Sequence, residues 1–240
     1  MHFYRSISDI KAMTFDLDDT LYDNVPVIHR VEKEVQAWIR TNYPKCGAYN
    51  NDDWFAFKKQ ARQENPELAN DVTLLRQQQL RLAFIYAGYD ASEVEVAIPK
   101  VMEQVRYWRH QIDIPAETHL VMAELAKHMP LVAITNGNVD PEEVGLAQYF
   151  SLVLKAGPDG KAKPHPDMFE RAASHLRLPP ESILHVGDHG VSDVFGAKEA
   201  GYMACWFNDQ FPNISTSRHM RTLPDVEIRT LSCLLNLVRY

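Results

Sequence analysis

Three aspartates and a threonine fall within five residues near the start of the chain. They form the segment Asp-Leu-Asp-Asp-Thr at 16–20, directly after the mostly apolar run 10–15. Carboxylates this close together repel one another and resist desolvation, so the cluster favours a site that holds a cation or moves a proton. If the strand geometry of the apolar run continues, Asp16 and Asp18 face one side while Asp19 points away. The alternative is an ordinary helix cap made by Asp18 or Asp19.

Three later segments carry polar groups at the ends of expected strands or at the start of an expected helix. They contain the remaining candidate site residues: Thr135, Asn136, Gly137, Lys163, Asp188 and Asp193. A threonine hydroxyl with nearby main-chain N–H groups can bind an anion, and a glycine before Asp188 lets the backbone approach closely. Singly, each segment has an ordinary explanation, as an Asn-Gly turn, a solvated lysine, a turn aspartate or a helix cap. Their joint order, each beside an expected strand end, is what indicates function.

The elements that must bring these residues together are predicted from the spacing of apolar residues. Short apolar runs indicate strands at 11–15, 131–135, 152–154, 183–187 and 203–206. Helical spacing indicates helices near 116–128, 141–148, 166–176 and 192–200. Strands and helices in alternation make a parallel sheet with helices on both faces. Ligands of such sheets bind beyond the carboxyl ends of the strands, which is where the candidate residues would meet.

A long helical insertion separates the first strand from the rest of this pattern. Apolar residues fall at helical spacing over 27–39, 54–61, 72–86 and 98–108, and the segment 112–115 indicates a linker back to the sheet. The prediction is an α/β core made of 1–21 and 113–240, with an all-helical domain inserted at 22–112. Near the other end, a loop over 208–222 is expected to precede a final strand and helix near 226–238. That loop contains Pro212, Asn213, Ser215 and Ser217.

Composition limits the partners and the compartment. The 240 residues are 45% hydrophobic and carry a formal net charge of −7, which argues against nucleic acid or an anionic membrane as a partner. Cys46, Cys205 and Cys233 are far apart and form no CxxC pair, so neither a disulfide framework nor a structural zinc site is indicated. Residues 1–9 lack the apolar core of a signal peptide. We therefore expect a cytoplasmic protein without a membrane span.

Asp16 to Thr20, Thr135, Lys163-Pro164 and the Gly-Asp-x-x-x-x-Asp pattern at 187–193 together resemble the four motifs of the haloacid dehalogenase superfamily of hydrolases. The resemblance covers the whole chain. It implies a Rossmann-like core, and it implies that 22–112 is the helical cap that this superfamily inserts after its first motif. Outside the catalytic positions, the chain resembles bacterial phosphatases that act on flavin mononucleotide and on 5-amino-6-(5-phospho-D-ribitylamino)uracil, a precursor of riboflavin.

The resemblance also implies Mg²⁺-dependent hydrolysis of a small phosphorylated metabolite. Asp16 would be the nucleophile that forms an aspartyl-phosphate. Asp18 would protonate the leaving oxygen and then activate water. Mg²⁺ would be held by Asp16, by the main-chain carbonyl of Asp18 and by Asp188.

The other motif residues would serve the phosphoryl group. Thr135 and the neighbouring Asn136 and Gly137 would bind its oxygens, and Lys163 would neutralise both these oxygens and the nucleophile. Asp193 would support either the waters of the metal or Lys163.

Several alternatives stay open within and beyond the superfamily. Asp18 favours a phosphatase over the dehalogenating branch, because a halide leaves without a proton whereas an alkoxide needs an acid. A sugar-phosphate phosphatase or a phosphomutase uses the same two aspartates. A phosphonate-cleaving relative would need a buried cap lysine, and nothing marks one among Lys33, Lys58, Lys59 and Lys100. Outside enzymes, the alternatives are a phospho-switch, such as a receiver domain, and a non-catalytic binding protein.

Two further segments each allow two interpretations. Residues 107–110, Tyr-Trp-Arg-His, could offer a ligand an aromatic face and a charge, or could pack as a helix with a solvated Arg109. His185 lies within an expected strand, so we interpret it as a core histidine with its hydrogen bonds satisfied. The sequence gives no prediction of the oligomeric state.

Overall fold

The chain folds into two compact units, one of which is built from both ends of the sequence. In the computed structural model, which describes residues 1–7, 9–210 and 220–238, the core unit comprises Met1–Asp23 and Asp113–Tyr240. The second unit, which we call the helical unit, comprises Asn24–Ile112. The expected loop residues Pro212, Asn213, Ser215 and Ser217 lie outside the described residues.

A mostly parallel sheet forms the centre of the core unit. Within the described residues its seven strands lie in the order β1, β7, β6, β5, β2, β3, β4, and β1 runs antiparallel to β7. The strands are β1 (His2–Phe3), β2 (Ala12–Phe15), β3 (Leu131–Thr135), β4 (Leu152–Lys155), β5 (Ile183–Gly187), β6 (Met203–Phe207) and β7 (Val226–Ile228). Every residue of β2, β3 and β5 is buried, because these apolar runs are covered on both faces.

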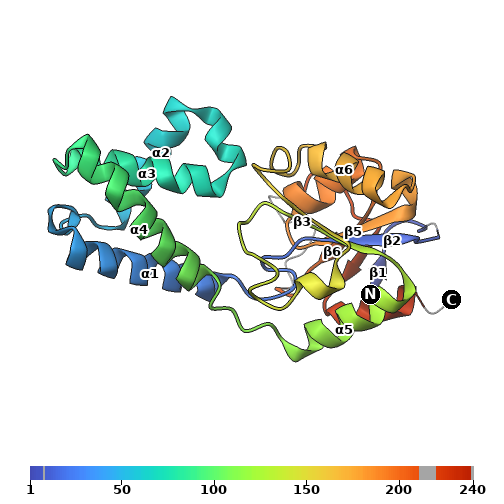
Figure 1. The fold of residues 1–240 in the computed structure, drawn as a ribbon. Helices are drawn as coiled ribbons and strands as arrows, with labels where there is room; N and C mark the ends of the chain where they lie inside the picture. The colour runs from blue at the N-terminus through green and yellow to red at the C-terminus, as the bar shows by residue number, and fades with distance from the viewer. Residues whose placement is uncertain (8, 211–219, 239–240) are drawn as a thin grey trace. The chain divides into compact units, whose positions relative to one another are not determined.

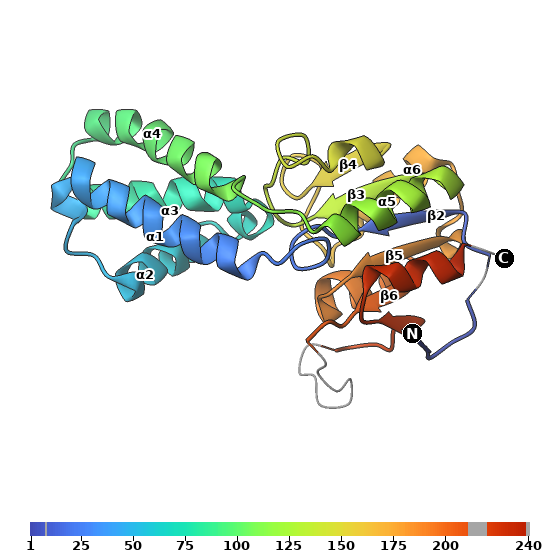
Figure 2. The ribbon, with the colours of Figure 1, turned by 90° about the horizontal axis from the view of Figure 1, so that it is seen from below.

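Helices cover both faces of this sheet, which confirms the predicted α/β fold class (Figure 1). On one face, α5 (Ala116–His128) packs beside the 3₁₀ helix η6 (Leu231–Leu237), as Figure 2 shows. On the opposite face lie α6 (Asp167–Leu176) and α7 (Gly196–Glu199). Met168 and Phe169 of α6 are fully buried against the strands. Burying one such side chain contributes about 1.5–3 kcal/mol.

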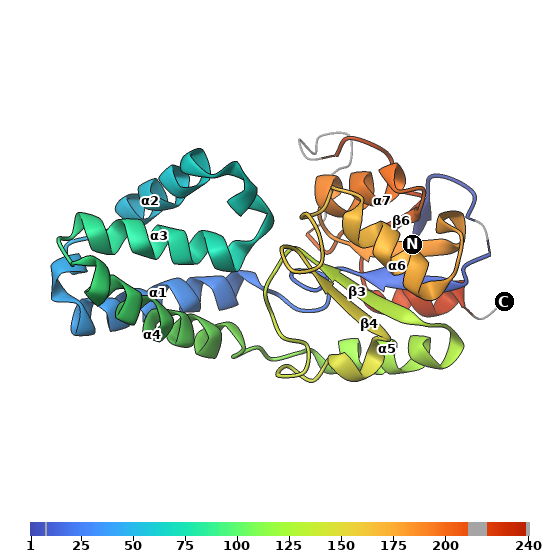
Figure 3. The same ribbon diagram turned by 45° about the horizontal axis from the view of Figure 1, so that its top comes forward.

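Four α-helices make up most of the helical unit: α1 (Val25–Asn42), α2 (Asn51–Glu64), α3 (Val72–Tyr86) and α4 (Ala91–Arg109). Within this unit α1 packs beside α4, and α2 beside α3 (Figure 3). The buried stripe of α1 within the helical unit consists of residues at four-residue intervals: Val27, Val31, Val35 and Ile39. Capping boxes at Asn50 and Asp90 fix the starts of α2 and α4. Among the described residues, no helix is long and apolar enough to cross a membrane.

The structure differs from the prediction in three places. The helix expected near 141–148 is instead a series of turns that ends in the 3₁₀ turn η3 (Ala147–Tyr149), because Gly145 has a φ of 74° that a helix cannot contain. The helix expected at 192–200 begins as the π-helical turn η5 (Gly190–Phe195) and continues as α7. Strand β1 was not predicted, because its two residues are exposed and carry no apolar alternation.

Candidate active site

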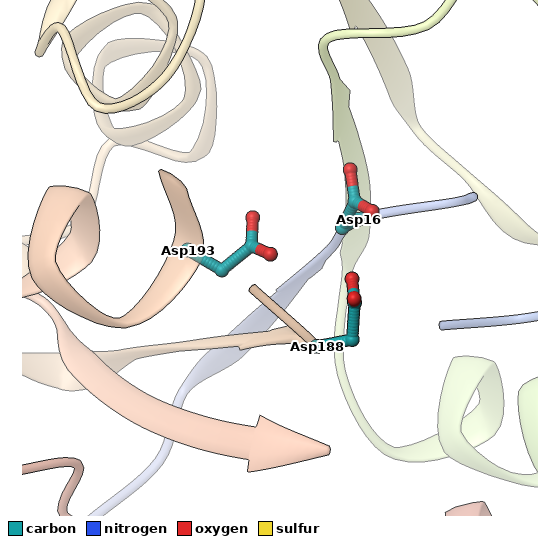
Figure 4. Close-up of side chains that lie close together, drawn as sticks. All are labelled: Asp16, Asp188 and Asp193. Atoms are coloured by element: carbon teal, nitrogen blue, oxygen red, sulfur yellow. The ribbon is translucent and has the colours of Figure 1, made fainter. Parts of the chain in front are cut away.

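Three neighbouring strands end at the same edge of the sheet and bring the candidate residues together. Asp16 follows β2, Thr135 is the last residue of β3, and Asp188 follows β5. Because β2 pairs in parallel with β3 on one side and with β5 on the other, these three ends are adjacent. Asp193 reaches the same point from η5, so that oxygens of Asp16, Asp188 and Asp193 lie within 4.8 Å of one another (Figure 4).

Lys163 lies among these carboxylates and is only 3% exposed. Its Nζ is 2.7 Å from Asp16 Oδ1 and 2.7 Å from Asp193 Oδ1, and it donates a third hydrogen bond to the main-chain carbonyl of Ile134. Burial acts to lower the pKa of Lys163, but the charges of Asp16 and Asp193 raise it above the usual lysine range. Lys163 is therefore a buried cation that joins two carboxylates, and the alternative of a solvated surface lysine is wrong.

Asn136 uses its side chain to hold Lys163 in place. Its Nδ2 donates to the main-chain carbonyl of Lys163 at 2.9 Å, and its Oδ1 accepts from the main-chain N–H of Lys163 at 2.7 Å. This pair of bonds ties the loop after β3 to the segment before α6. The sequence suggested that Asn136 binds substrate, whereas in the structure both ends of its amide engage the protein.

Asp18 is held by two neighbours. The hydroxyl of Tyr22 donates to Asp18 Oδ1 at 2.6 Å. On the other side, a Cβ at Gly137 would lie 2.2 Å from Asp18 Oδ2, so only a glycine lets the loop after β3 come this close. The N–H of Gly137 in turn donates to the hydroxyl oxygen of Thr135 at 2.9 Å. The threonine hydroxyl, the glycine and the Asp18 carboxylate thus form one continuous wall of the site.

Asp188 is half-buried and held through its main chain. The indole Nε1 of Trp206, in β6, donates to the main-chain carbonyl of Asp188 at 2.7 Å. The Thr20 hydroxyl lies 3.4 Å from Asp188 Oδ1, a long hydrogen bond. Burial, together with the charges of Asp193 and Asp19, raises the pKa of Asp188 to about 7. The ionised form of Asp188 therefore calls for an additional positive charge.

Asp193, by contrast, already has its hydrogen bonds satisfied. It accepts from Lys163, from His185 Nε2 at 3.2 Å and from the main-chain N–H of His189 at 2.9 Å. Burial acts to raise the pKa of Asp193, but the charge of Lys163 and the hydrogen bond from His185 hold it below the usual aspartate range. A Cβ at Gly187 would lie 2.3 Å from Asp193 Cγ, so the glycine makes room for this carboxylate.

The donor set fits a hard divalent cation. Burial raises the pKa of Asp16 well above its usual range, and this effect exceeds the opposing charge of Lys163. If Asp16, Asp188 and Asp193 are all ionised, Lys163 offsets one of their three charges, and the remainder matches a divalent ion. Oxygen ligands of this kind suit Mg²⁺. Because Asp193 is already held by three donors, Asp16 and Asp188 are the side chains that fit the metal.

A cavity of about 190 Å³ opens at this edge of the sheet. All of its lining residues belong to the core unit: Asp16, Asp18, Asp19, Thr135, Asn136, Gly137, Lys163, Asp188, His189, Ser192 and Asp193. Pockets that enclose a whole drug-sized ligand have about 300–1,000 Å³. This cavity is smaller, so it suits a compact anionic group with its counter-ion rather than an entire metabolite.

Two interpretations from the sequence are wrong. Asp19 was expected to point away, but it lines the same cavity as Asp16 and Asp18. The strand geometry ends at Phe15, and Asp19 has a φ of 58°, so the alternation of a strand does not extend to it. Arg109 was expected to be solvated if it packed in a helix, yet it is only 4% exposed at the end of α4.

Sequence reasoning missed three residues that hold the site: Thr14, Tyr22 and Trp206. Trp206 lies near the end of the strand beside β5, so the strand-end rule could have found it. His185 was correctly interpreted as a buried histidine with both ring nitrogens hydrogen-bonded, but its contact with Asp193 was not foreseen. Thr14 lies two positions before Asp16, so the alternation of a strand could have placed it on the same face. Nothing in the spacing of apolar residues links Tyr22 to the site.

The fold and the site together define the class of the protein. A sequence profile described as haloacid dehalogenase-like hydrolase matches residues 10–201, which include every motif residue of the site. The chain belongs to this family of hydrolases, and the resemblance found in the sequence is confirmed.

Particular members of the family are similar along nearly the whole chain. The Escherichia coli (strain K12) protein named 5-amino-6-(5-phospho-D-ribitylamino)uracil phosphatase YigB is 42% identical over 238 residues, which cover 99% of this chain and 100% of that protein. A phosphoserine phosphatase of Thermus thermophilus is 30% identical, over 82% of this chain and 88% of its own length. Among solved structures, a protein titled 2-haloacid dehalogenase from Pseudomonas syringae pv. Tomato has a TM-score of 0.89 and 36% identity, over 95% of this chain and 97% of its own.

Proposed function

We propose that this protein is a Mg²⁺-dependent phosphatase that hydrolyses small phosphomonoesters through a phosphorylated Asp16. The observation that carries the proposal is the pair of aspartates at the end of β2. Asp16 lies 2.7 Å from the buried Lys163 ammonium, while Asp18 is oriented separately by Tyr22. One carboxylate is thus placed for attack and the other for proton transfer.

In the first step, a carboxylate oxygen of Asp16 attacks phosphorus, and the bond from phosphorus to the alcohol oxygen breaks. The Asp18 carboxyl donates its proton to that oxygen, so the product leaves as a neutral alcohol. Lys163 offsets the negative charge of the phosphoryl oxygens and of Asp16. The Thr135 hydroxyl, whose oxygen accepts from the Gly137 N–H, lies at the wall of the cavity and donates to the same phosphoryl oxygens.

In the second step, the ionised Asp18 removes a proton from a water molecule. The water oxygen attacks phosphorus, the bond to Asp16 breaks, and inorganic phosphate is released with both aspartates returned to their starting states. We infer that Asp16, Asp188 and the main-chain carbonyl of Asp18 would hold Mg²⁺. When bound, the ion would offset charge on the phosphoryl oxygens. Asp193 then serves Lys163 rather than the metal.

For the substrate we propose a small phosphorylated metabolite, with 5-amino-6-(5-phospho-D-ribitylamino)uracil as the first candidate and flavin mononucleotide as the second. The proposal rests on the 42% identity to the Escherichia coli phosphatase named for the first compound. It is consistent with the cavity of about 190 Å³, which suits the phosphate ester end of such a molecule. We also propose that the protein is a soluble metabolic enzyme of the cytoplasm.

Dehalogenation is the second candidate, because a protein titled 2-haloacid dehalogenase is 36% identical to this chain. Displacement of a halide from carbon needs neither an acid for the leaving group nor a divalent cation to offset a phosphoryl charge. The oriented Asp18 carboxylate and the excess acidic charge beside Asp16 therefore favour phosphate esters.

One substrate panel tests the proposal. The purified full-length protein, with Mg²⁺, is offered the ribitylaminouracil phosphate, flavin mononucleotide, sugar phosphates, phosphoserine, phosphoglycolate and L-2-chloropropionate. Release of inorganic phosphate and of chloride is measured separately. We expect phosphate release with the highest kcat/KM for the ribitylaminouracil phosphate, and no chloride. Chloride release without phosphate release would contradict the proposed function. Phosphate release led by another ester would contradict only the proposed substrate.

A further inference from the structure

Beneath the site, a continuous chain of buried hydrogen bonds reaches from the middle of the sheet to Asp16. The Thr14 Oγ1 is 2.7 Å from His185 Nδ1, and His185 Nε2 is 3.2 Å from Asp193 Oδ1. Asp193 Oδ1 is 2.7 Å from Lys163 Nζ, which is 2.7 Å from Asp16 Oδ1. None of these five residues is more than 7% exposed, so water does not compete for their hydrogen bonds.

Thr14 and His185, at the end of this series of hydrogen bonds farthest from Asp16, are fixed by the sheet itself. Thr14 of β2 and His185 of β5 are register partners in adjacent parallel strands, so their side chains lie side by side on one face. The ring of Phe169, from α6, packs edge-on against the imidazole at 5.0 Å and 84°. The imidazole can therefore neither rotate into solvent nor exchange its two partners.

These partners determine where the ring proton lies. An ionised Asp193 carboxylate only accepts hydrogen bonds, so the facing Nε2 must carry a proton. Nδ1 then accepts from the Thr14 hydroxyl, which can donate. The opposite tautomer would direct a lone pair at the carboxylate. Asp193 thus selects the form of His185 that donates to it, and the Thr14 hydroxyl satisfies the remaining ring nitrogen.

We propose that His185, held between Thr14 and Asp193, is a positioning residue that fixes Asp193 and thereby holds Lys163 Nζ against Asp16. Neither Thr14 nor His185 lines the cavity, so both act on the site through Asp193. Without the donor on Nε2, Asp193 keeps Lys163 and the His189 N–H as partners but loses one of the three contacts that fix its orientation. Because Lys163 Nζ is shared between Asp193 and Asp16, a reoriented Asp193 would draw Lys163 away from the nucleophile.

The first test reads the tautomer and does not depend on any enzymatic activity. Protein labelled with ¹⁵N-histidine is examined by long-range ¹H–¹⁵N correlation at pH 7, and the His185 signals are identified by their absence from His185→Gln. We expect a proton on Nε2 and none on Nδ1. A His185 without a proton on Nε2 would overturn the proposal. In Thr14→Val and in Thr14→Ser we expect Nε2 to keep its proton, because the Asp193 carboxylate still accepts from it.

The second test uses two substitutions that divide the functions of the imidazole. Glutamine places an amide where Nε2 stood and can still donate to Asp193, whereas asparagine reaches only the position of Nδ1. The effect on turnover rests on the proposed phosphatase function. For the ester that the wild type hydrolyses best, we expect kcat to fall about 10- to 100-fold in His185→Asn, because the donor to Asp193 is lost. In His185→Gln it should stay within about threefold of wild type, and KM should change little in either variant.

A purely structural role predicts a different result. If His185 only fills space, kcat follows the thermal stability of the variants and glutamine gives no rescue, which would overturn the proposal. If the wild type releases no phosphate, the proposed function fails, and crystal structures of the two variants decide the positioning role on their own. The proposal then requires Lys163 Nζ to stay hydrogen-bonded to Asp16 in His185→Gln and to be displaced in His185→Asn. An undisplaced Lys163 in both variants would contradict it.

Discussion

The Asp18 carboxylate has a different neighbour at each oxygen. The Tyr22 hydroxyl donates to Oδ1, and Gly137 lies beside Oδ2. The hydroxyl orients the carboxyl group, and the glycine leaves room for it. At the scale of the single residue, these contacts orient the Asp18 side chain in the same cavity as Asp16, which suits the proton transfer proposed for it.

The role of Asp18 predicts a dependence on the leaving group. In Asp18→Asn, kcat for an alkyl phosphate should fall by about 10²–10⁴-fold, because the alkoxide then leaves without a proton. With p-nitrophenyl phosphate the first step should be affected much less, since p-nitrophenolate leaves unprotonated. Burst kinetics of p-nitrophenolate release measure this step. Equal losses of the burst rate and of alkyl turnover would be inconsistent with an acid role.

Tyr22→Phe is the matched control for this prediction, because it removes the hydrogen bond to Asp18 Oδ1 and keeps the buried ring. We expect a smaller loss of about 3- to 10-fold in kcat, in line with the roughly 1 kcal/mol of one hydrogen bond. A loss as large as that of Asp18→Asn would mean that Tyr22 itself takes part in proton transfer.

The proposed nucleophile, Asp16, gives a second prediction at this scale. Asp16→Asn should reduce turnover by at least about 10³-fold, because an amide oxygen is a poor nucleophile and the bond to phosphorus cannot form. Incubation with ³²P-labelled substrate and acid quenching should label the wild type and leave the variant unlabelled. Labelling of Asp16→Asn would place the covalent bond on another residue.

At the scale of the elements, Asn136 joins two loops that carry site residues. Asn136→Ala removes both hydrogen bonds to the Lys163 main chain, and Asn136→Asp replaces a donor with a charged acceptor that faces the Lys163 carbonyl. We expect kcat to fall about 10-fold or more in both, with the larger loss in Asn136→Asp. Steady-state kinetics measure the losses of kcat. A lower kcat in the alanine variant than in the aspartate variant would argue against this role of the two Asn136 hydrogen bonds.

In the helical unit, Arg76 of α3 forms a bidentate pair with Glu32 of α1. Burial acts to raise the pKa of Glu32, but the hydrogen bond and charge of Arg76 hold it below the usual range. A lowered folded-state pKa means that the stabilisation is present above the unfolded value, about 4.3, and is lost as pH falls through the folded-state pKa. Glu32→Gln should therefore destabilise the protein at pH 7 and have a smaller effect at pH 3.

Urea unfolding at the two pH values measures this difference. Because the Glu32 side chain is 37% exposed, solvent screens the pair, and we expect about 0.5 kcal/mol at pH 7. Glu95→Gln is the control, since the pair of Glu95 with Arg81 joins α3 to α4 with both side chains more exposed. It should change stability less than Glu32→Gln. A Glu32→Gln effect that grows as pH falls would contradict the assigned direction of the pKa.

The sequence predicts elements well where burial makes the apolar pattern strong. The fully buried strands β2, β3 and β5 are read directly from their apolar runs, and their ends locate Asp16, Thr135 and Asp188. What the pattern cannot show is contact made through the tertiary fold. The bonds from Asn136 to Lys163 span 27 positions, and those from Trp206 to Asp188 and from Thr14 to His185 depend on strand order. The direction of Asp19 was misjudged because its positive φ leaves no trace in polarity.

For the whole molecule, the acidic site should couple metal binding to folding. Mg²⁺ that binds the folded protein and not the unfolded chain stabilises it by about 2.7 kcal/mol at 100 times Kd. We therefore expect Mg²⁺ to raise the Tm of the core unit, and EDTA to lower it and to abolish phosphate release. Differential scanning calorimetry of wild type and Asp188→Asn measures the effect, which the variant should largely lose. A Tm of the wild type that does not respond to Mg²⁺ would contradict the metal site.

The core unit is built from two separated stretches of chain, and this has a consequence for the order in which the molecule forms during synthesis. Strand β2 leaves the ribosome before the helical unit, whereas its neighbours β3 and β5 follow only after the whole helical unit has been made. Thr14, for example, hydrogen-bonds with His185, which lies 171 positions further along the sequence. The helical unit, whose contacts are closer in sequence, can fold first. Asp16 is thus translated before the helical unit, yet its surroundings are complete only when Asp193 has emerged, so a nascent chain that ends before Asp193 carries no assembled site.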